Sequence, residues 1–116
     1  MPLFPTVSTI QNSVILVEGI FDVLNLHDKG LTNAVCCFGV KNFIDEKIEM
    51  LSVQGVTSID IFLDNDEAGQ NGAAKIKEQC EKFGLNTRNI AFGDKYLDAG
   101  ALNQSQVDNL RRKLYA

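Results

Sequence analysis

The sequence predicts an α/β fold in which about four mainly parallel strands are covered by helices on both faces. Short β-branched runs alternate with stretches of helical periodicity along the 116 residues, which is typical of repeated strand–helix units. The first run, SVILV at residues 13–17, is almost wholly apolar, as expected for a central strand buried on both sides. Gly30, Gly55 and Gly84 each follow a helical stretch, where a glycine commonly ends a helix.

The first half of the chain predicts two strand–helix units. Strands are expected over residues 13–17 and 33–38, and helices over about residues 20–29 and 45–53. The spacing typical of one helix face holds in the first helix for Ile20, Val23, Leu24 and His27. In the second helix, Ile48 and Leu51 are expected to point inward.

The second half continues the alternation. A third strand is expected over residues 58–63, a long helix up to about residue 83, and a fourth strand over residues 87–92. One face of the long helix carries Ala73, Ile76, Cys80 and Phe83. Residues 93–104 are interpreted as a loop. The segment from Ser105 to Asp108 resembles a capping box that opens a last helix, which ends in a basic cluster at residues 111–113.

Length and charge narrow the functions open to the chain. A mass of 12.8 kDa predicts one domain over residues 1–116, with a core at about 13–92 and a loop and helix at 93–116. The net charge of −4 argues against a domain that holds nucleic acid by its overall field. No apolar run reaches the ~18 residues of a membrane span. Three cysteines without CxxC spacing favour a reducing, cytoplasmic location.

Carboxylates follow two of the predicted strands. Glu18 comes after the first strand and Asp64 after the third, with Asp66 and Glu67 in the next turn and Asp22 in the first turn of a helix. Because ligands of open α/β sheets lie beyond the carboxyl ends of the strands, these side chains are expected to share one crevice. Hard oxygen ligands of this kind suit Mg²⁺.

Each acid also has a purely structural interpretation. An aspartate at a strand-to-helix junction often caps the helix, and Asp22 stabilises a helix N-terminus by its charge alone. Gly19 is interpreted as removing a Cβ where the chain leaves the sheet. Gly69 and Gly72, early in the long helix, fit close helix packing and phosphate approach equally well.

Three segments follow one another in a distinctive order: VEGIFDVL at residues 17–24, NAVCCFGV at 33–40 and FLDNDEAG at 62–69. Their order and spacing resemble the Toprim domain, a Rossmann-like fold, and most closely its version in DnaG-type bacterial primases. The family is known for a Glu-Gly motif after its first strand and an Asp-x-Asp motif after its third. Both motifs occur here, separated by a strand and a helix.

The resemblance implies a role for each acid. Glu18 would be the general acid or base of nucleotidyl or phosphodiester transfer, and Asp64 and Asp66 would carry Mg²⁺ or Mn²⁺. Asp22 would be a further acidic member of the site, and Glu67 is a possible addition. Primases of this type usually show a later segment resembling Lys-Asp-Pro-Asp. Its nearest counterpart here provides only Lys95, Asp98 and, as a substitute, Asp94.

The function implied is Mg²⁺-dependent RNA primer synthesis for DNA replication. The implied partners are a single-stranded DNA template, an RNA primer, nucleotides and other primase domains or replication proteins, with no membrane. A zinc-binding module and a larger polymerase domain do not fit in 116 residues, so a fragment, a standalone protein and a subunit of an assembly all stay open.

Two other functions remain open as well. A small nuclease would use the same metal site to activate water. A non-catalytic scaffold in DNA repair or recombination would bind partners or DNA ends. Receiver domains need paired acids after the first strand, and dehalogenase-like phosphatases place Asp-x-Asp there; neither pattern fits Glu18-Gly19.

Overall fold

The computed structural model describes residues 5, 7–36, 45–63, 67–90 and 99–115. Four strands form one sheet in the order β2-β1-β3-β4, and every neighbouring pair is parallel. The strands are β1 (Ser13–Val17), β2 (Ala34–Cys36), β3 (Ser58–Ile61) and β4 (Asn86–Asn89). The helices are α1 (Ile20–Asp28), α2 (Asp45–Val53), α3 (Glu67–Lys82) and α4 (Gln104–Tyr115), with a short 3-10 helix η2 (Ala99–Ala101) before the last. The predicted α/β class and parallel sheet are confirmed.

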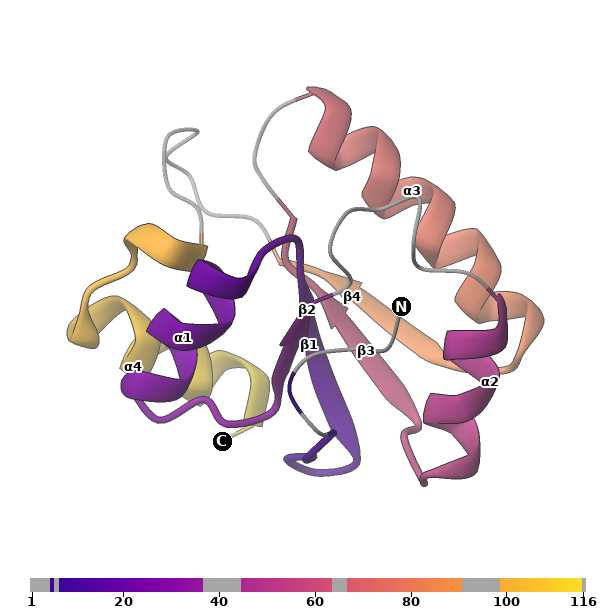
Figure 1. The fold of residues 1–116 in the computed structure, drawn as a ribbon, viewed down its shortest axis with the longest axis horizontal. Coiled ribbons are helices and arrows are strands. Elements are labelled where there is room, and N and C mark those ends of the chain that lie inside the picture. The colour runs from indigo at the N-terminus through magenta and orange to yellow at the C-terminus, as the bar shows by residue number, and fades with distance from the viewer. Residues whose placement is uncertain (1–4, 6, 37–44, 64–66, 91–98, 116) are drawn as a thin grey trace.

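Helices cover both faces of the sheet, as predicted (Figure 1). Helices α1 and α4 lie on one side, and α2 and α3 lie on the other. Alternate residues of β1 point to opposite sides, so Val14 and Leu16 belong to the core under α2 and α3, whereas Ile15 and Val17 belong to the core under α1 and α4. All five residues of β1 are buried, which explains its continuous apolar sequence.

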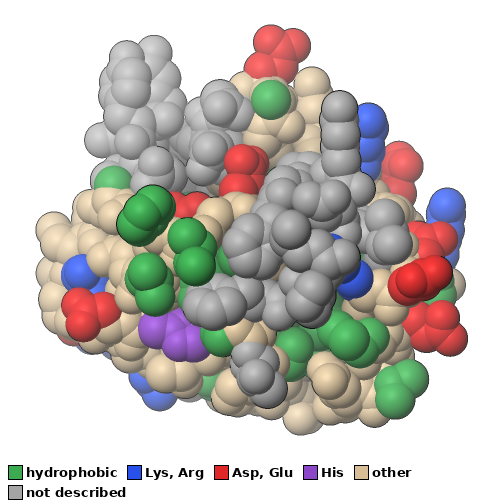
Figure 2. Space-filling model, viewed as in Figure 1, with side chains coloured by type: hydrophobic (Ala, Val, Ile, Leu, Met, Phe, Trp, Pro, Cys, Tyr) green, Lys and Arg blue, Asp and Glu red, His purple; other side chains and the backbone are tan. Residues whose placement is uncertain are grey.

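The face of α1 that packs inward differs from the predicted set. Val23 and Leu26 are buried, while Ile20 is 37% exposed and Leu24 50% exposed. Exposed hydrophobic side chains gather over α1 beside the only histidine of the chain (Figure 2). His27 itself is half-buried, and one ring nitrogen lies 2.9 Å from the carbonyl oxygen of Ala34. The error arose because apolar residues occur on two adjacent faces of this helix.

Helix α2 has the predicted bounds, and Ile48 and Leu51 are buried. The α3 prediction is correct for Ala73, Ile76 and Cys80, which are buried, but wrong for Phe83. Phe83 follows the last residue of the helix and is 36% exposed. The chain turns away from the helix at Gly84, two residues after Lys82, with a φ of +75° in the left-handed region that glycine adopts most easily.

The capping box of α4 is two residues earlier than predicted. The amide of Gln106 donates to Asn103 Oδ1 at 2.9 Å, and the amide of Asn103 donates to Gln106 Oε1 at 2.9 Å. The reciprocal pair is therefore Asn103 with Gln106. The interpretation of Ser105 and Asp108 as the box is wrong, because the helix has already begun at Gln104.

The third strand is shorter than predicted, because it ends at Ile61 and the next two residues are not in a strand. The fourth spans Asn86–Asn89, so it begins one residue earlier than predicted and ends before Ile90. The second spans Ala34–Cys36 in the described part of the chain, and the predicted ends of the second and fourth strands, Phe38 and Phe92, lie outside the described residues. Within the part of the chain that the structure describes, no helix is long and apolar enough to cross a membrane.

Candidate metal centre

The carboxyl ends of β1 and β3 lie side by side at one edge of the sheet. Leu16 is the register partner of Ile61, and the amide of Phe62 donates to the carbonyl of Leu16 at 2.8 Å. Glu18 follows β1 directly and is half-buried, and Leu63 follows β3 and is buried. This arrangement supports the prediction that the two strands deliver their acidic motifs to the same edge.

Asp22 folds back onto the turn that carries Glu18. Its Oδ2 accepts a hydrogen bond of 3.2 Å from the amide of Gly19, which immediately precedes α1. The interaction stabilises the first turn of α1, because that amide has no partner within the helix and the carboxylate is favourable at the positive end of the helix dipole. Asp22 therefore has a structural role in addition to any role at a metal.

Among the described residues, nothing requires the missing Cβ of Gly19 where the chain leaves the sheet. Its φ of −129° and ψ of 164° are extended values that any residue adopts. A Cβ built there would meet its nearest described neighbour, Asp22 Oδ2, at 3.7 Å, an ordinary contact. Gly69 and Gly72 are both buried in α3, which fits close packing of that helix.

The predicted site residues fall into two groups. Glu18 and Asp22 are described and lie together at the end of β1, and Glu67 is the first residue of α3 and is exposed. The others lie outside the described residues: Asp64, Asp66, Asp94, Lys95 and Asp98. No three His, Cys, Asp or Glu side chains of the described residues come together as a metal site.

The donor chemistry of the described part is compatible with a hard cation. Glu18 and Asp22 provide carboxylate oxygens, and both are half-buried rather than free to move in solvent. Mg²⁺ takes oxygen ligands and is commonly bound through one or two carboxylates together with waters and phosphate. These two side chains fit such an ion, with the remaining ligands to come from elsewhere in the chain or from substrate.

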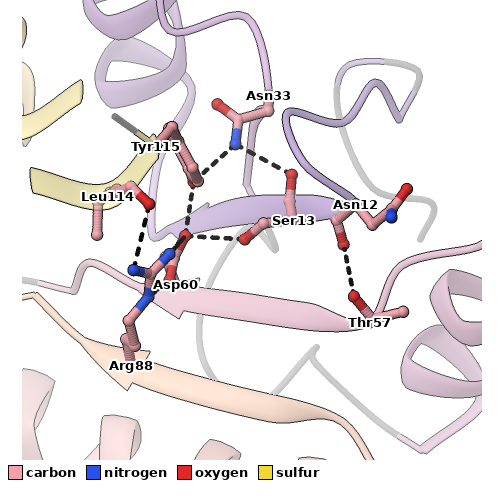
Figure 3. A network of polar contacts seen from close by, with 8 residues as sticks. All are labelled: Asn12, Ser13, Asn33, Thr57, Asp60, Arg88, Leu114 and Tyr115. Carbon is pink, nitrogen blue, oxygen red and sulfur yellow. Dashed lines mark hydrogen bonds and ion pairs between the residues drawn. The ribbon is translucent and has the colours of Figure 1, made fainter. Parts of the chain in front are cut away.

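A polar network that joins the sheet to α4 was missed by sequence analysis. Asp60 is fully buried in β3 and accepts hydrogen bonds from Ser13 Oγ at 2.8 Å and Tyr115 Oη at 2.6 Å (Figure 3). Arg88 completes the set, because its Nε donates to Asp60 Oδ1 at 2.7 Å and its Nη2 to Oδ2 at 3.3 Å. The buried carboxylate is thereby both paired and hydrogen-bonded, as burial of a charge requires.

Asn33 extends this network beneath the helices. Its Nδ2 donates to the carbonyl of Ser13 at 3.0 Å and to Tyr115 Oη at 2.9 Å. Burial, together with the hydrogen bond to Asp60, raises the pKa of the Tyr115 phenol well above its ordinary value. One signal for the network was available in the sequence, since Asp60 interrupts the apolar run of a strand that is otherwise buried on both faces.

Comparison with known proteins places this fold in a family. Residues 15–106 match the family described as Toprim-like. An uncharacterised protein of Mycoplasma genitalium is 37% identical over 98 residues, which cover 82% of this chain and 44% of that protein. The DNA primase of Chlamydia pneumoniae is 35% identical over 71 residues, which cover 61% of this chain and 12% of the primase.

Solved structures agree with the sequence comparison. The crystal structure of the Aquifex aeolicus primase, comprising its zinc-binding and RNA polymerase domains, matches with a TM-score of 0.75 at 25% identity. The match covers 88% of this chain and 25% of that structure. The chain thus spans less than half the length of the curated relatives and of the solved structure that it matches.

Proposed function

The chain belongs to the Toprim-like family, and from that premise we propose that it is the Mg²⁺-binding catalytic module of a DnaG-type primase. In this proposal it takes part in nucleotidyl transfer during RNA primer synthesis on a single-stranded DNA template. The substrates would be nucleotides, and the partners would be the other domains of a primase or other replication proteins.

The position of Glu18 and Asp22 is the observation that carries the proposal. Both lie where β1 ends, and β3 ends at the same edge of the sheet, three residues before the first aspartate of the Asp64-x-Asp66 motif. In open α/β folds this edge is where ligands bind. The likeness to DNA primases in both sequence and fold supports the same proposal.

Nucleotidyl transfer requires a general base, a cation and a fixed geometry of the reacting groups. A bound Mg²⁺ would stabilise the charge that develops on the transferring phosphoryl group. Asp64 and Asp66 are proposed as its ligands, with Asp22 as a further acidic group. Glu18 is proposed as the general acid or base. It is the first residue after the buried strand β1, and it is itself half-buried.

Calorimetric titration with Mn²⁺ tests the metal assignment. The Asp64→Ala/Asp66→Ala variant is expected to lose at least about tenfold in Mn²⁺ affinity. This value is conservative, because the loss of one group that only hydrogen-bonds to a metal ligand typically lowers the affinity by about 10–100-fold. The matched control is Glu46→Ala/Glu49→Ala, which removes the same charge from exposed positions of α2. Equal Mn²⁺ binding by the wild type and the Asp64/Asp66 variant would disprove the assignment.

A chimera tests the reaction. In the chimera, this chain replaces the matching segment of the Chlamydia pneumoniae primase, and primer synthesis is expected. Introducing Glu18→Gln into the chimera should abolish that synthesis. The same template is examined for nicking. Nicking without synthesis would favour the nuclease, and intact Mn²⁺ binding with neither activity would favour the scaffold.

A further inference from the structure

Strand β4 is the edge of the sheet, with β3 as its one neighbour in the strand order. The amides of Asn86 and Ile90 donate inward to the carbonyls of Thr57 and Ile61, at 3.0 and 2.8 Å. Backbone groups of alternate residues point to opposite sides of a parallel strand. Thr87 therefore directs its amide and carbonyl away from β3. No strand of the described residues pairs with that outer side.

A pocket of about 800 Å³ lies beside this open edge, between the end of β4 and α4. Its apolar wall consists of Ile90, Leu110 and Leu114, and its polar rim of Arg88, Asn89, Asn109 and Lys113. The pocket is therefore large enough for a side chain with its flanking backbone, and it offers an apolar floor with a polar mouth. It lies away from Glu18 and has no part in the proposed metal site.

The charge at the mouth of the pocket is effectively that of one lysine. Arg88 lines the pocket, but its guanidinium is paired with Asp60 and also donates to the carbonyl of Leu114 at 3.3 Å (Figure 3). Lys113 is exposed and has no carboxylate partner among the described residues. A ligand with a single carboxylate near Lys113 would complement this charge.

We propose that β4 and the adjoining pocket bind an extended segment of a partner protein by strand addition. The segment pairs with the outward backbone groups of β4, inserts an apolar side chain against Ile90, Leu110 and Leu114, and places a carboxylate near Lys113. Side chains two positions apart share one face of a strand, so the apolar residue and the acidic residue are expected at positions i and i+2. Backbone pairing gives affinity in this mode, and the pocket gives specificity.

The residues of β4 argue against β4 of a second copy of this chain as the occupant. Strand β4 has the sequence NTRN, which contains neither an apolar side chain for the pocket nor a carboxylate for Lys113. Nucleic acid is disfavoured at this site because none of the described residues that line the pocket is aromatic, so none of them offers a surface for base stacking.

The test is an NMR titration of the labelled protein with an acetylated and amidated heptapeptide, Thr-Val-Thr-Leu-Thr-Asp-Thr. Chemical-shift changes are expected at the amides of Thr87, Asn89, Ile90, Leu110 and Lys113. Thr87→Pro removes an outward amide, and proline is tolerated at such an edge position. That variant should bind at least about fivefold more weakly, the equivalent of one lost hydrogen bond, while Thr87→Val, which keeps the amide, should bind as the wild type does.

A charge exchange provides a second measurement that does not alter the backbone of β4. Lys113→Glu should bind the heptapeptide more weakly than the wild type does. It should prefer a heptapeptide in which lysine replaces the aspartate. Shift changes confined to other residues, or none at millimolar peptide, would overturn the proposal. So would stronger binding of oligothymidylate at the same amides, or self-association through β4 that Thr87→Pro abolishes in sedimentation.

Discussion

The phenol of Tyr115 donates a hydrogen bond of 2.6 Å to the carboxylate of Asp60, across 55 residues of sequence. Asp60 is in the middle of the sheet, and Tyr115 is the last residue of α4. Two further bonds hold the same turn of the helix, from Arg88 Nη1 to the carbonyl of Leu114 and from Gln11 Nε2 to the carbonyl of Tyr115. The C-terminal helix is thus attached to the sheet by polar contacts as well as by its apolar face.

Replacing Tyr115 by phenylalanine tests the value of this attachment. The ring and its packing are retained, but Asp60 loses one buried donor and Asn33 loses one acceptor. The free energy of unfolding is expected to fall by about 1–3 kcal/mol, the usual effect of leaving a buried polar group without a partner. Urea denaturation measures it.

Thr57→Val is the matched control for that substitution. It also removes one hydroxyl, but the hydrogen bond of Thr57 to the carbonyl of Asn12 is long, at 3.4 Å, and exposed. A change within about 0.5 kcal/mol is expected, as at most exposed positions. If both variants lose the same stability, the buried network contributes no more than a surface contact.

The fall of the unfolding free energy at alkaline pH should reflect the ionisation of two buried groups, Tyr115 and Cys80. Burial and the hydrogen bond to Asp60 raise the pKa of Tyr115 above its ordinary value of 10.0. Burial, with a smaller effect of Glu81, raises the pKa of Cys80 from 9.0 to about 12. In each case the unfolded chain ionises first, so the stabilisation is complete below the unfolded pKa and is lost as pH rises above it.

The free energy of unfolding of the wild type is therefore expected to fall from about pH 9 upward, where the first of the two groups ionises in the unfolded chain. Urea denaturation between pH 8 and pH 11 measures the slope. The Tyr115→Phe/Cys80→Ala variant should be less stable at pH 8 but should have a flatter alkaline slope. A slope equal to that of the wild type would assign the alkaline loss to other groups.

Periodicity and composition over a few residues predicted the parts of the fold that depend on neighbours in the sequence. The bounds of α2 and the buried strand β1 follow from periodicity and composition over a few residues. The face of α1 was not predicted, because Ile20 and Leu24 satisfy the same helical spacing as Val23 and Leu26. Only the position of the sheet, a tertiary property, decides which pair is buried.

The polar network shows the same limit at longer range. Asp60 is conspicuous in an apolar strand, but its partners Ser13, Arg88 and Tyr115 lie 47, 28 and 55 residues away. No local rule joins them. The candidate acidic site could be proposed from the sequence, because Glu18 and Asp22 are close in the chain and the order of motifs resembles a family that the chain matches.

The capping assignment of α4 has a direct test. Asn103→Ala removes the side chain that accepts from the amide of Gln106 and should cost about 1 kcal/mol in unfolding free energy. Ser105 is exposed within the first turn, so Ser105→Ala should change the stability by less than about 0.5 kcal/mol. Thermal unfolding of both variants compares them, and the reverse order of losses would restore Ser105 as the cap.

Asp22 needs a substitution that separates its structural role from its proposed role at the metal. Asp22→Asn keeps an oxygen that accepts from the amide of Gly19 but removes the negative charge. The substitution removes only the interaction of a half-buried charge with the helix dipole, so the unfolding free energy should fall by about 0.3–1 kcal/mol. Mn²⁺ affinity should fall several-fold if Asp22 contributes charge to the site, and calorimetry on the folded variant measures this directly.

Asp28→Asn, at the exposed other end of the same helix, removes an equal charge and should leave Mn²⁺ affinity unchanged. An Asp22→Asn variant that binds Mn²⁺ as tightly as the wild type would confine this aspartate to capping α1.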